Sequence, residues 1–172
     1  MVSVNWLDGT DFGYYALCPA SYLQDWDGTE ANEVFQAYVS KVPLPDHGEV
    51  LTIGGEALPV TYLPESMTFV QNVGSDEKVD LHKEAERAMD AQGWQDAVEI
   101  ALGGRYFLID SGVPGAETEE RYMIQVDVPH GRYQVRSLSI DLPLGEFYLH
   151  RLVPSASPRL GDGPAHTPVR RP

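Results

Sequence analysis

The only cysteine, Cys18, could supply a thiolate nucleophile. A catalytic thiolate is favoured by nearby positive charge and partial exposure. Cys18 instead ends the apolar and aromatic run FGYYALC, in the half of the chain that is poorest in basic residues. Burial and negative charge both raise the pKa of a thiol. The sequence therefore predicts that Cys18 is a small core residue.

Histidines and carboxylates could bind a metal or carry out general acid-base catalysis, but their spacing indicates neither. The five histidines are far apart in the sequence. His82 and Glu86 are four residues apart on a predicted helix, whereas a metal site needs three or four ligands. Asp110 and Ser111 follow a predicted strand and could belong to an acid-base pair, but among 26 acidic residues such pairs arise by chance. The sequence contains no Gly-rich phosphate loop, HExxH, CxxC or GxSxG pattern, so it predicts no catalytic residue, metal or cofactor.

Acidic residues dominate the composition. The chain has 12 Lys and Arg against 26 Asp and Glu, which gives a net charge of −14 at pH 7. The imbalance is strongest before Glu77, where Lys41 is the only basic residue. Such a chain repels the phosphates of nucleic acids and anionic membranes, and it attracts basic proteins. Solubility explains the same charge, so charge alone leaves both interpretations open.

The N-terminal half predicts short strands and one helical turn. FGYYALC, closed by Pro19, is typical of a buried strand, and residues 19–28 could form a helical turn that ends at Gly28. Residues 33–42 fit a helical stripe but also have strand-like composition; we favour a helix there. The runs EVLTI, LPVTYL and MTFVQNV, separated by Gly and Pro, predict an antiparallel meander.

Two helices and four strands are predicted next. The first helix begins with a cap at Ser75 or Asp76 and extends to about residue 92, and the second covers residues 94–102. RYFLID, RYMIQVDV, RYQVRSLSI and EFYLHRLV then have strand character. We expect a tight hairpin at residues 129–131 and a bulge near Ser137, where the alternation changes face.

These elements predict an α+β fold that is mostly antiparallel β-sheet, with a helical segment around residues 76–102. The prolines of residues 154–172 predict a disordered tail after a single domain of residues 1–153. One cysteine and no apolar run of the ~20 residues that span a bilayer are typical of a cytoplasmic protein.

Four segments in sequence order resemble a known family. They are WLDGTDFGYYALCPASYLQDWDG, GGEALPVTYLPESMTFVQ, YFLIDSGVPG, and PHGRYQVRSLSI followed by FYLHRLVP. Their order and spacing are similar to the Imm21-type immunity proteins of bacterial polymorphic toxin systems, over about residues 4–154. The chain departs from that family at residues 9–13, where the family has a Gly-Gly-Pro-like turn. The resemblance implies a non-enzymatic antidote that binds and blocks a toxin domain.

Charge and resemblance together favour a basic toxin, such as a nuclease, as the partner. We expect carboxylates to attract it and a tryptophan to anchor it. The predicted toxin-binding residues are Asp8, Asp11, Asp25, Trp26, Asp27, Glu30 and Glu33. One alternative is a small hydrolase, which a pocket joining Asp110, a histidine and Cys18 would indicate. Another is a ligand-binding regulatory β module, which an enclosed apolar cavity would indicate. The oligomeric state stays open.

Overall fold

An antiparallel sheet accounts for most of the fold. The computed structural model describes residues 4–8, 10, 13–28, 37–44, 46–54, 56–75, 79–143 and 145–156. The strands are β1 (Tyr14–Pro19), β2 (Val39–Leu44), β3 (Gly48–Gly54), β4 (Val60–Leu63), β5 (Thr68–Ser75), β6 (Gln95–Asp110), β7 (Ile124–Leu142) and β8 (Gly145–Pro154). They pair antiparallel in the order β2-β3-β1-β6-β7-β8-β5-β4. The helical elements are α2 (Leu81–Ala88) and the 3-10 turns η1 (Leu23–Asp25), η2 (Pro64–Ser66), η3 (Gly115–Glu117) and η4 (Glu120–Tyr122). The predicted α+β class with mostly antiparallel sheet is confirmed.

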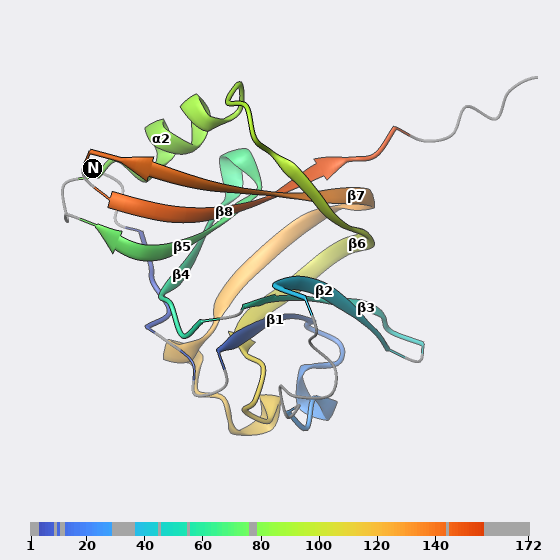
Figure 1. Ribbon diagram of the computed structural model, residues 1–172. Coiled ribbons are helices and arrows are strands. Elements are labelled where there is room, and N and C mark those ends of the chain that lie inside the picture. Colours follow the sequence, from blue (N-terminus) through green and yellow to red (C-terminus); the bar gives the residue numbers. More distant parts are fainter. Residues whose placement is uncertain are drawn as a thin grey trace, which may run out of the picture.

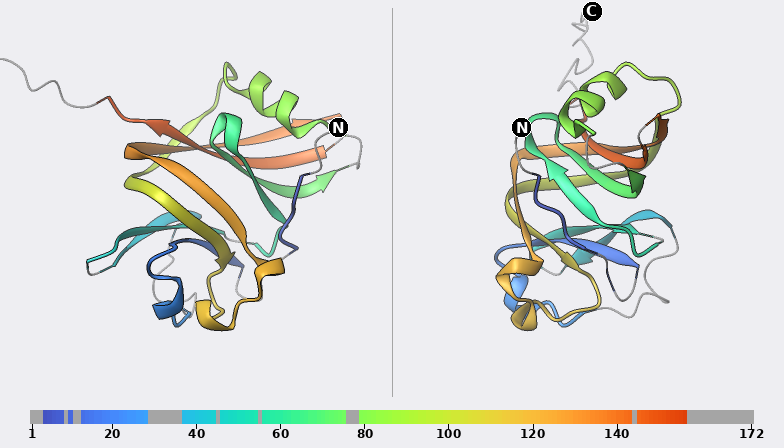
Figure 2. Two further views of the ribbon diagram at one scale, coloured as in Figure 1. Left: turned by 180° about the vertical axis from the view of Figure 1, so that it is seen from behind. Right: turned by 90° about the vertical axis from the view of Figure 1, so that its left-hand side faces the viewer.

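Two long strands bend this sheet into two layers. β6 and β7 run through both layers, with β1, β2 and β3 on one side and β4, β5 and β8 on the other (Figure 1). The two further views show the same arrangement, with α2 against the outer face of the layer that contains β5 and β8 (Figure 2). Strong twist and coiling of this kind are natural for long antiparallel strands.

Apolar side chains fill three clusters, one between the layers and one on the outside of each. The cluster between the layers includes Leu17, Ile53, Phe69 and Leu108, all fully buried. On one outer face Val70, Leu138 and Phe147 pack against Leu81 and Ala85 of α2. On the other, Cys18, Val50 and Ile109 pack against Leu23 and Trp26 around η1. Because both faces of the sheet are covered, many strand residues are buried on both sides, which explains the nearly continuous apolar runs of β1 and β4.

The helix predicted from residue 75 or 76 is confirmed over a shorter span. Asp80 caps it by accepting a hydrogen bond from Lys83 N at 3.3 Å, whereas Ser75 ends β5 and residue 76 lies outside the described residues. The second helix, over residues 94–102, is wrong, because this segment is the start of β6. Ile100 and Leu102 point into the core in alternation with exposed neighbours, and pairing with β7 satisfies the backbone.

Four other predictions for the N-terminal half had different outcomes. The buried strand closed by Pro19 is confirmed as β1, and the helical turn after it is η1. The helix favoured for residues 33–42 is wrong from Val39 onward, where the chain forms β2; residues 33–36 lie outside the described residues. In the predicted meander, β4 and β5 do pair, but β3 pairs with β1 and β2.

The hairpin predicted at residues 129–131 is wrong, because β7 continues through it. Leu102 pairs with Gly131 and Gly104 with Val128, so β7 holds one extra residue between these pairs. This bulge depends on glycine in β6: a Cβ at residue 103 would overlap the His130 ring, and Gly104 has φ +102°.

The bulge predicted near Ser137 does not lie in β7, the strand that contains this residue. Pairing of β7 with β8 is unbroken from Tyr133 to Leu142, and the extra residue at this level is Ala97 in β6. Val135 faces the cluster between the layers, whereas Leu138 faces the cluster under α2. The alternation changes because the strand passes from one covered face to the other.

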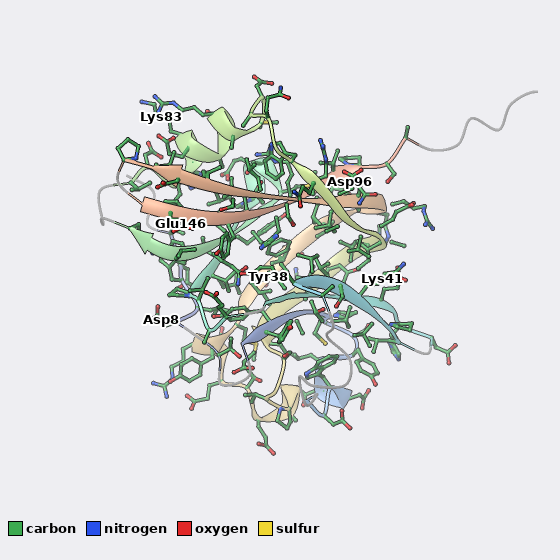
Figure 3. All side chains as sticks on the ribbon, viewed as in Figure 1. Asp8, Tyr38, Lys41, Lys83, Asp96 and Glu146 are labelled. Atoms are coloured by element: carbon green, nitrogen blue, oxygen red, sulfur yellow. The ribbon has the colours of Figure 1, made fainter. Side chains whose placement is uncertain are left out.

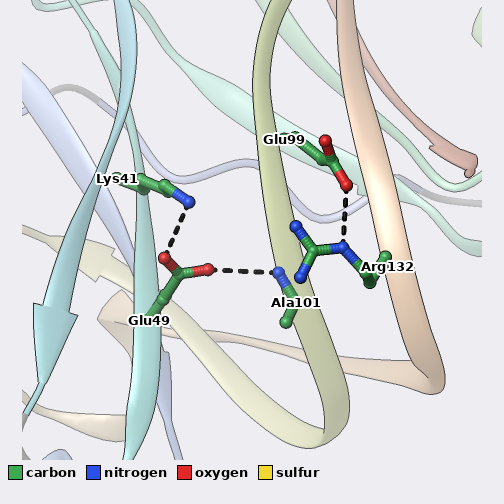
Figure 4. Close-up of polar contacts among 5 residues, drawn as sticks. All are labelled: Lys41, Glu49, Glu99, Ala101 and Arg132. Atoms are coloured by element: carbon green, nitrogen blue, oxygen red, sulfur yellow. Dashed lines mark hydrogen bonds and ion pairs between the residues drawn. The ribbon is translucent and has the colours of Figure 1, made fainter.

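A carboxylate joins the two layers where no strand pairing does so (Figure 4). Glu49 on β3 receives Lys41 Nζ at 2.7 Å and the backbone N–H of Ala101 on β6 at 3.2 Å. Burial would raise the pKa of Glu49, but these hydrogen bonds outweigh it and hold the pKa below its ordinary value. Beside it, Arg132 donates to Glu99 at 2.7 Å across β7 and β6.

Among the described residues, no helix has the length and apolar character needed to cross a membrane.

Candidate binding surface

Turns from distant parts of the sequence meet at one end of the molecule. They are η1, the loop after β6, and η3 with η4, which lie at the bottom of Figure 1. The end of the segment before β1 adjoins them, because Asp8 and Thr10 line one cavity together with Glu119 and Tyr122. Gly115 N donates to Trp26 O at 2.7 Å and so joins η3 to η1. A Cβ at Gly115 would overlap Leu23 O, so only glycine allows this close approach.

Trp26 holds this end together from the inside. It is 4% exposed, packs among Ala16, Cys18 and Leu23, and its Nε1 donates to Ser111 O at 3.1 Å. An interface anchor must offer its area to a partner, and Trp26 has almost none left to offer. The role of anchor expected from the sequence therefore does not fit Trp26.

The carboxylates around Trp26 are exposed, and others join them from later in the chain. Of the predicted acids, Asp8, Asp25 and Asp27 are exposed, while Asp11, Glu30 and Glu33 lie outside the described residues. The structure adds the exposed residues of η3 and η4. We call the following set the acidic end: Asp8, Asp25, Asp27, Glu117, Glu119, Glu120 and Tyr122. The later members were missed because they are about ninety residues away in sequence; the run ETEE at residues 117–120 was the available signal.

A cavity of about 630 Å³ lies at this end. Its lining includes the carboxylates of Asp8, Asp110, Glu117 and Glu119 and the ring of Tyr122. Tyr122 is 54% exposed. Several carboxylates beside an aromatic ring suit a lysine or arginine side chain, since both charge and ring face attract cations.

The chain's own arginine makes contacts of this kind beside the cavity. Arg121 pairs with Glu119 at 2.9 Å, and its guanidinium carbon lies 4.6 Å from the centre of the Tyr122 ring. Of the basic residues in the described chain, only Arg121 belongs to these turns, so most of the carboxylates at this end keep their charge uncompensated.

The residues considered for catalysis do not come together in one site. Cys18 is fully buried, and burial raises its pKa to about 12, so it stays a thiol. Asp110 lines the acidic cavity and accepts a hydrogen bond from Gly112 N at 3.0 Å, as a turn residue does. No histidine lines that cavity. The pocket joining Asp110, a histidine and Cys18, which would indicate a hydrolase, is therefore not formed.

The two residues considered as metal ligands on the predicted helix, His82 and Glu86, are not paired with each other. His82 Nδ1 lies 3.5 Å from Glu65 Oε2 in η2, rather than being paired with Glu86. Within the described part of the chain, no group of three or more His, Cys, Asp or Glu side chains could hold a metal ion.

Sequence reasoning missed a buried polar chain across three strands. His150 on β8 is 2% exposed; Ser137 Oγ lies 2.8 Å from its Nδ1, and Gln71 Oε1 lies 2.9 Å from its Nε2. Burial lowers the pKa of His150 to about 3, so the ring is neutral: Nε2–H donates to Gln71 and Nδ1 accepts from Ser137. With its pKa this low and both ring nitrogens hydrogen-bonded, His150 is a poor general base. The polar chain instead fixes β5, β8 and β7 to one another.

Comparison with known proteins adds one match. The family model described as Immunity protein 21 matches residues 6–143, which include β1 to β7, α2 and the acidic end. Comparisons with curated proteins and with solved structures gave no match.

Proposed function

This chain belongs to the immunity protein 21 family, and on that premise we propose that it neutralises a cognate basic toxin domain by binding it through the acidic end. The family match carries this proposal, because an immunity protein acts by association with a toxin. The proposal adds the surface used and the charge of the partner. A nuclease is one class of toxin whose substrate-binding face is basic.

Exposed charge at the acidic end supports the choice of surface. Asp8, Asp25 and Asp27 come from the N-terminal segment and Glu117 from η3, so several elements contribute charge to one end. Charges of one sign in a small area speed the approach of an oppositely charged protein. A stable complex buries roughly 800 Å² on each partner.

Tyr122 also supports the choice of the acidic end, because it offers an apolar contact to a partner. It is one of two large apolar side chains that stay exposed among the described residues, the other being Met89 of the α2 end. Tyrosines at the centre of a charged patch often carry much of the binding energy, because they bury a large area with little loss of side-chain freedom. Tyr122 takes the place that Trp26, being buried, cannot take.

The test is protection of a host cell. The gene next to this one is searched for a large secreted protein with a C-terminal toxin domain, and that domain is expressed with and without this chain. We expect growth only when both are present, and a complex of the two purified proteins on size-exclusion chromatography. A toxin that kills equally in both strains, with no complex formed, would contradict the proposal.

The surface is tested in the same assay. The double variant Asp8→Lys and Glu117→Lys should weaken protection, and Asp141→Lys with Glu146→Lys, which reverses two exposed acids on β7 and β8, is the matched control. Equal loss of protection in both pairs would show that net charge, rather than the acidic end, matters.

A further inference from the structure

A second cavity, of about 830 Å³, lies between the two layers, apart from the acidic end. Figure 3 shows Tyr38 in the middle of this view, between β8 and β2, and Asp96 near the start of β6. We call it the Tyr38 cleft. The residues that matter for its chemistry are Tyr38, Glu56, Asp96, Ser137, Tyr148 and His150.

Hydrogen-bond acceptors form the floor of this cleft. His150 is neutral, and its Nδ1 accepts a hydrogen bond from the Ser137 hydroxyl. The one O–H of Ser137 is therefore engaged with His150, and the Ser137 oxygen can still accept a hydrogen bond from a ligand. Tyr38 Oη is buried and has no hydrogen-bond partner among the described residues. A buried hydroxyl without a partner is costly, and a ligand in the cleft would remove that cost.

Aromatic rings form one wall. The rings of Tyr38 and Tyr148 lie 5.6 Å apart, edge to face, and the Tyr38 ring lies 5.6 Å from the His150 ring. A cation is attracted to the faces of such rings, and a planar guanidinium also stacks on them.

Carboxylates stand at the rim. Asp96 is already paired with Arg136 at 2.9 Å, whereas Glu56 is exposed and has no ion pair in the described part of the chain. Glu56 lies close enough to Tyr38 to act on it: burial chiefly, then Tyr148 and Glu56, raise the pKa of the Tyr38 hydroxyl. The cleft thus combines free acceptors, ring faces and one unpaired negative charge.

We propose that the Tyr38 cleft binds an arginine side chain of the partner protein. A guanidinium has five N–H donors in a plane, enough to reach Glu56, Ser137 Oγ and Tyr38 Oη while it lies against a tyrosine ring. A lysine ammonium is compact and cannot stack in this way. Since His150 is neutral, the floor does not repel the cation. That the arginine belongs to a toxin rests on the proposed function. The preference of the cleft for a guanidinium is independent of it.

The first experiment tests the cleft without any toxin. Acetyl-arginine-methylamide is titrated into the full chain and followed by the backbone amide signals of Ala97 and Ser139, which line the cleft. The control compound is acetyl-citrulline-methylamide, which has the same shape without the charge. We expect saturable shifts at these two amides with the arginine compound and roughly fivefold weaker binding of the citrulline compound. Equal responses, or shifts confined to the acidic end, would overturn the proposal.

Variants assign the interaction to named groups. Glu56→Gln and Tyr38→Phe should each bind the arginine compound roughly fivefold more weakly. Glu146→Gln removes an equal negative charge from an exposed residue that does not line the cleft, and this variant should bind as the wild type does. If Glu56→Gln and Glu146→Gln behave alike, the cleft does not recognise the cation. The comparison of the two compounds on the unaltered chain stands even if a variant fails to fold.

The second experiment uses a toxin that the unaltered chain neutralises. Tyr38→Phe and Glu56→Gln should raise the dissociation rate of that complex roughly fivefold. Neutralisation by the wild type with unchanged dissociation in both variants would overturn the cleft's role and leave the proposed function standing. A chain that binds the arginine compound in the cleft but neutralises no toxin would support the cleft and contradict the proposed function.

Discussion

The acidic end and the Tyr38 cleft both combine carboxylates with tyrosine, but they differ in what holds them. At the acidic end the carboxylates are exposed on turns, and their charge reaches far into solvent. In the cleft Ser137, Tyr148 and His150 lie on strands, whereas Tyr38 and Glu56 lie just outside β2 and β3. The buried chain from Gln71 through His150 to Ser137 fixes the floor. Exposed charge sets the rate of encounter, whereas fixed, desolvated groups set how long a complex lasts. The two regions are therefore suited to different steps of one association.

The largest effect should come from the residue that supports the acidic end from within. Trp26→Ala should lower the free energy of unfolding by about 3–5 kcal/mol, because it empties a closely packed site and leaves Ser111 O without its donor. Urea unfolding measures this. Tyr122→Ala, at the exposed surface of the same end, should change stability by less than about 0.5 kcal/mol. If the two variants lose similar amounts of unfolding free energy, Trp26 stabilises the acidic end no more than an exposed side chain does.

His150, at the floor of the Tyr38 cleft, should make stability depend on pH. Burial lowers the pKa of His150 from 6.5 to about 3 in the folded chain, so the unfolded chain binds the additional proton between these values. The stabilisation is complete above about pH 6.5 and is lost as the pH falls towards about 3, at up to about 1.4 kcal/mol per pH unit. Unfolding curves of His150→Gln should lack this contribution. His47→Gln, which changes an exposed histidine, should keep it, and equal slopes in the wild type and His150→Gln would refute the assignment.

A moderate effect is expected on the rate at which the acidic end meets a basic toxin. Asp8→Lys with Glu117→Lys should slow association about tenfold at low salt, which stopped-flow fluorescence can follow. At 1 M salt, where the screening length is about 3 Å, the difference should nearly vanish. Asp141→Lys with Glu146→Lys serves as the control. If the difference persists at high salt, these carboxylates act by contact rather than by long-range attraction.

The smallest effect is expected from the carboxylate between the layers. Glu49→Gln loses the ion pair with Lys41, while its amide oxygen still accepts from Ala101 N. Since the ion pair is partly exposed, the free energy of unfolding should fall by less than about 1 kcal/mol. Thermal unfolding measures it. A larger loss would show that this link, rather than the shared core, holds the layers and therefore shapes the cleft.

Local patterns predicted those elements whose burial is simple. The strand closed by Pro19 and the helix with Leu81 and Ala85 on one face follow from composition and spacing, and both are present. Residues 94–102 were misread because Trp94, Val98 and Leu102 have helical spacing too. The residue pattern cannot show that a strand 29 or more residues away (131 − 102 = 29 at the nearest pair) is available to pair with this segment, and that pairing decides the outcome.

Composition determined that the chain is acidic and has one cysteine, and local patterns predicted that it is mostly strand, since these properties need no contacts between distant residues. Only the tertiary structure decided that Trp26 is buried, that Glu117 lies at the same end as Asp8, and that Tyr38 meets His150 more than a hundred positions later. Each of these outcomes depends on how the long strands β6 and β7 bend the sheet. That bend brings remote side chains together, and no local pattern of residues encodes it.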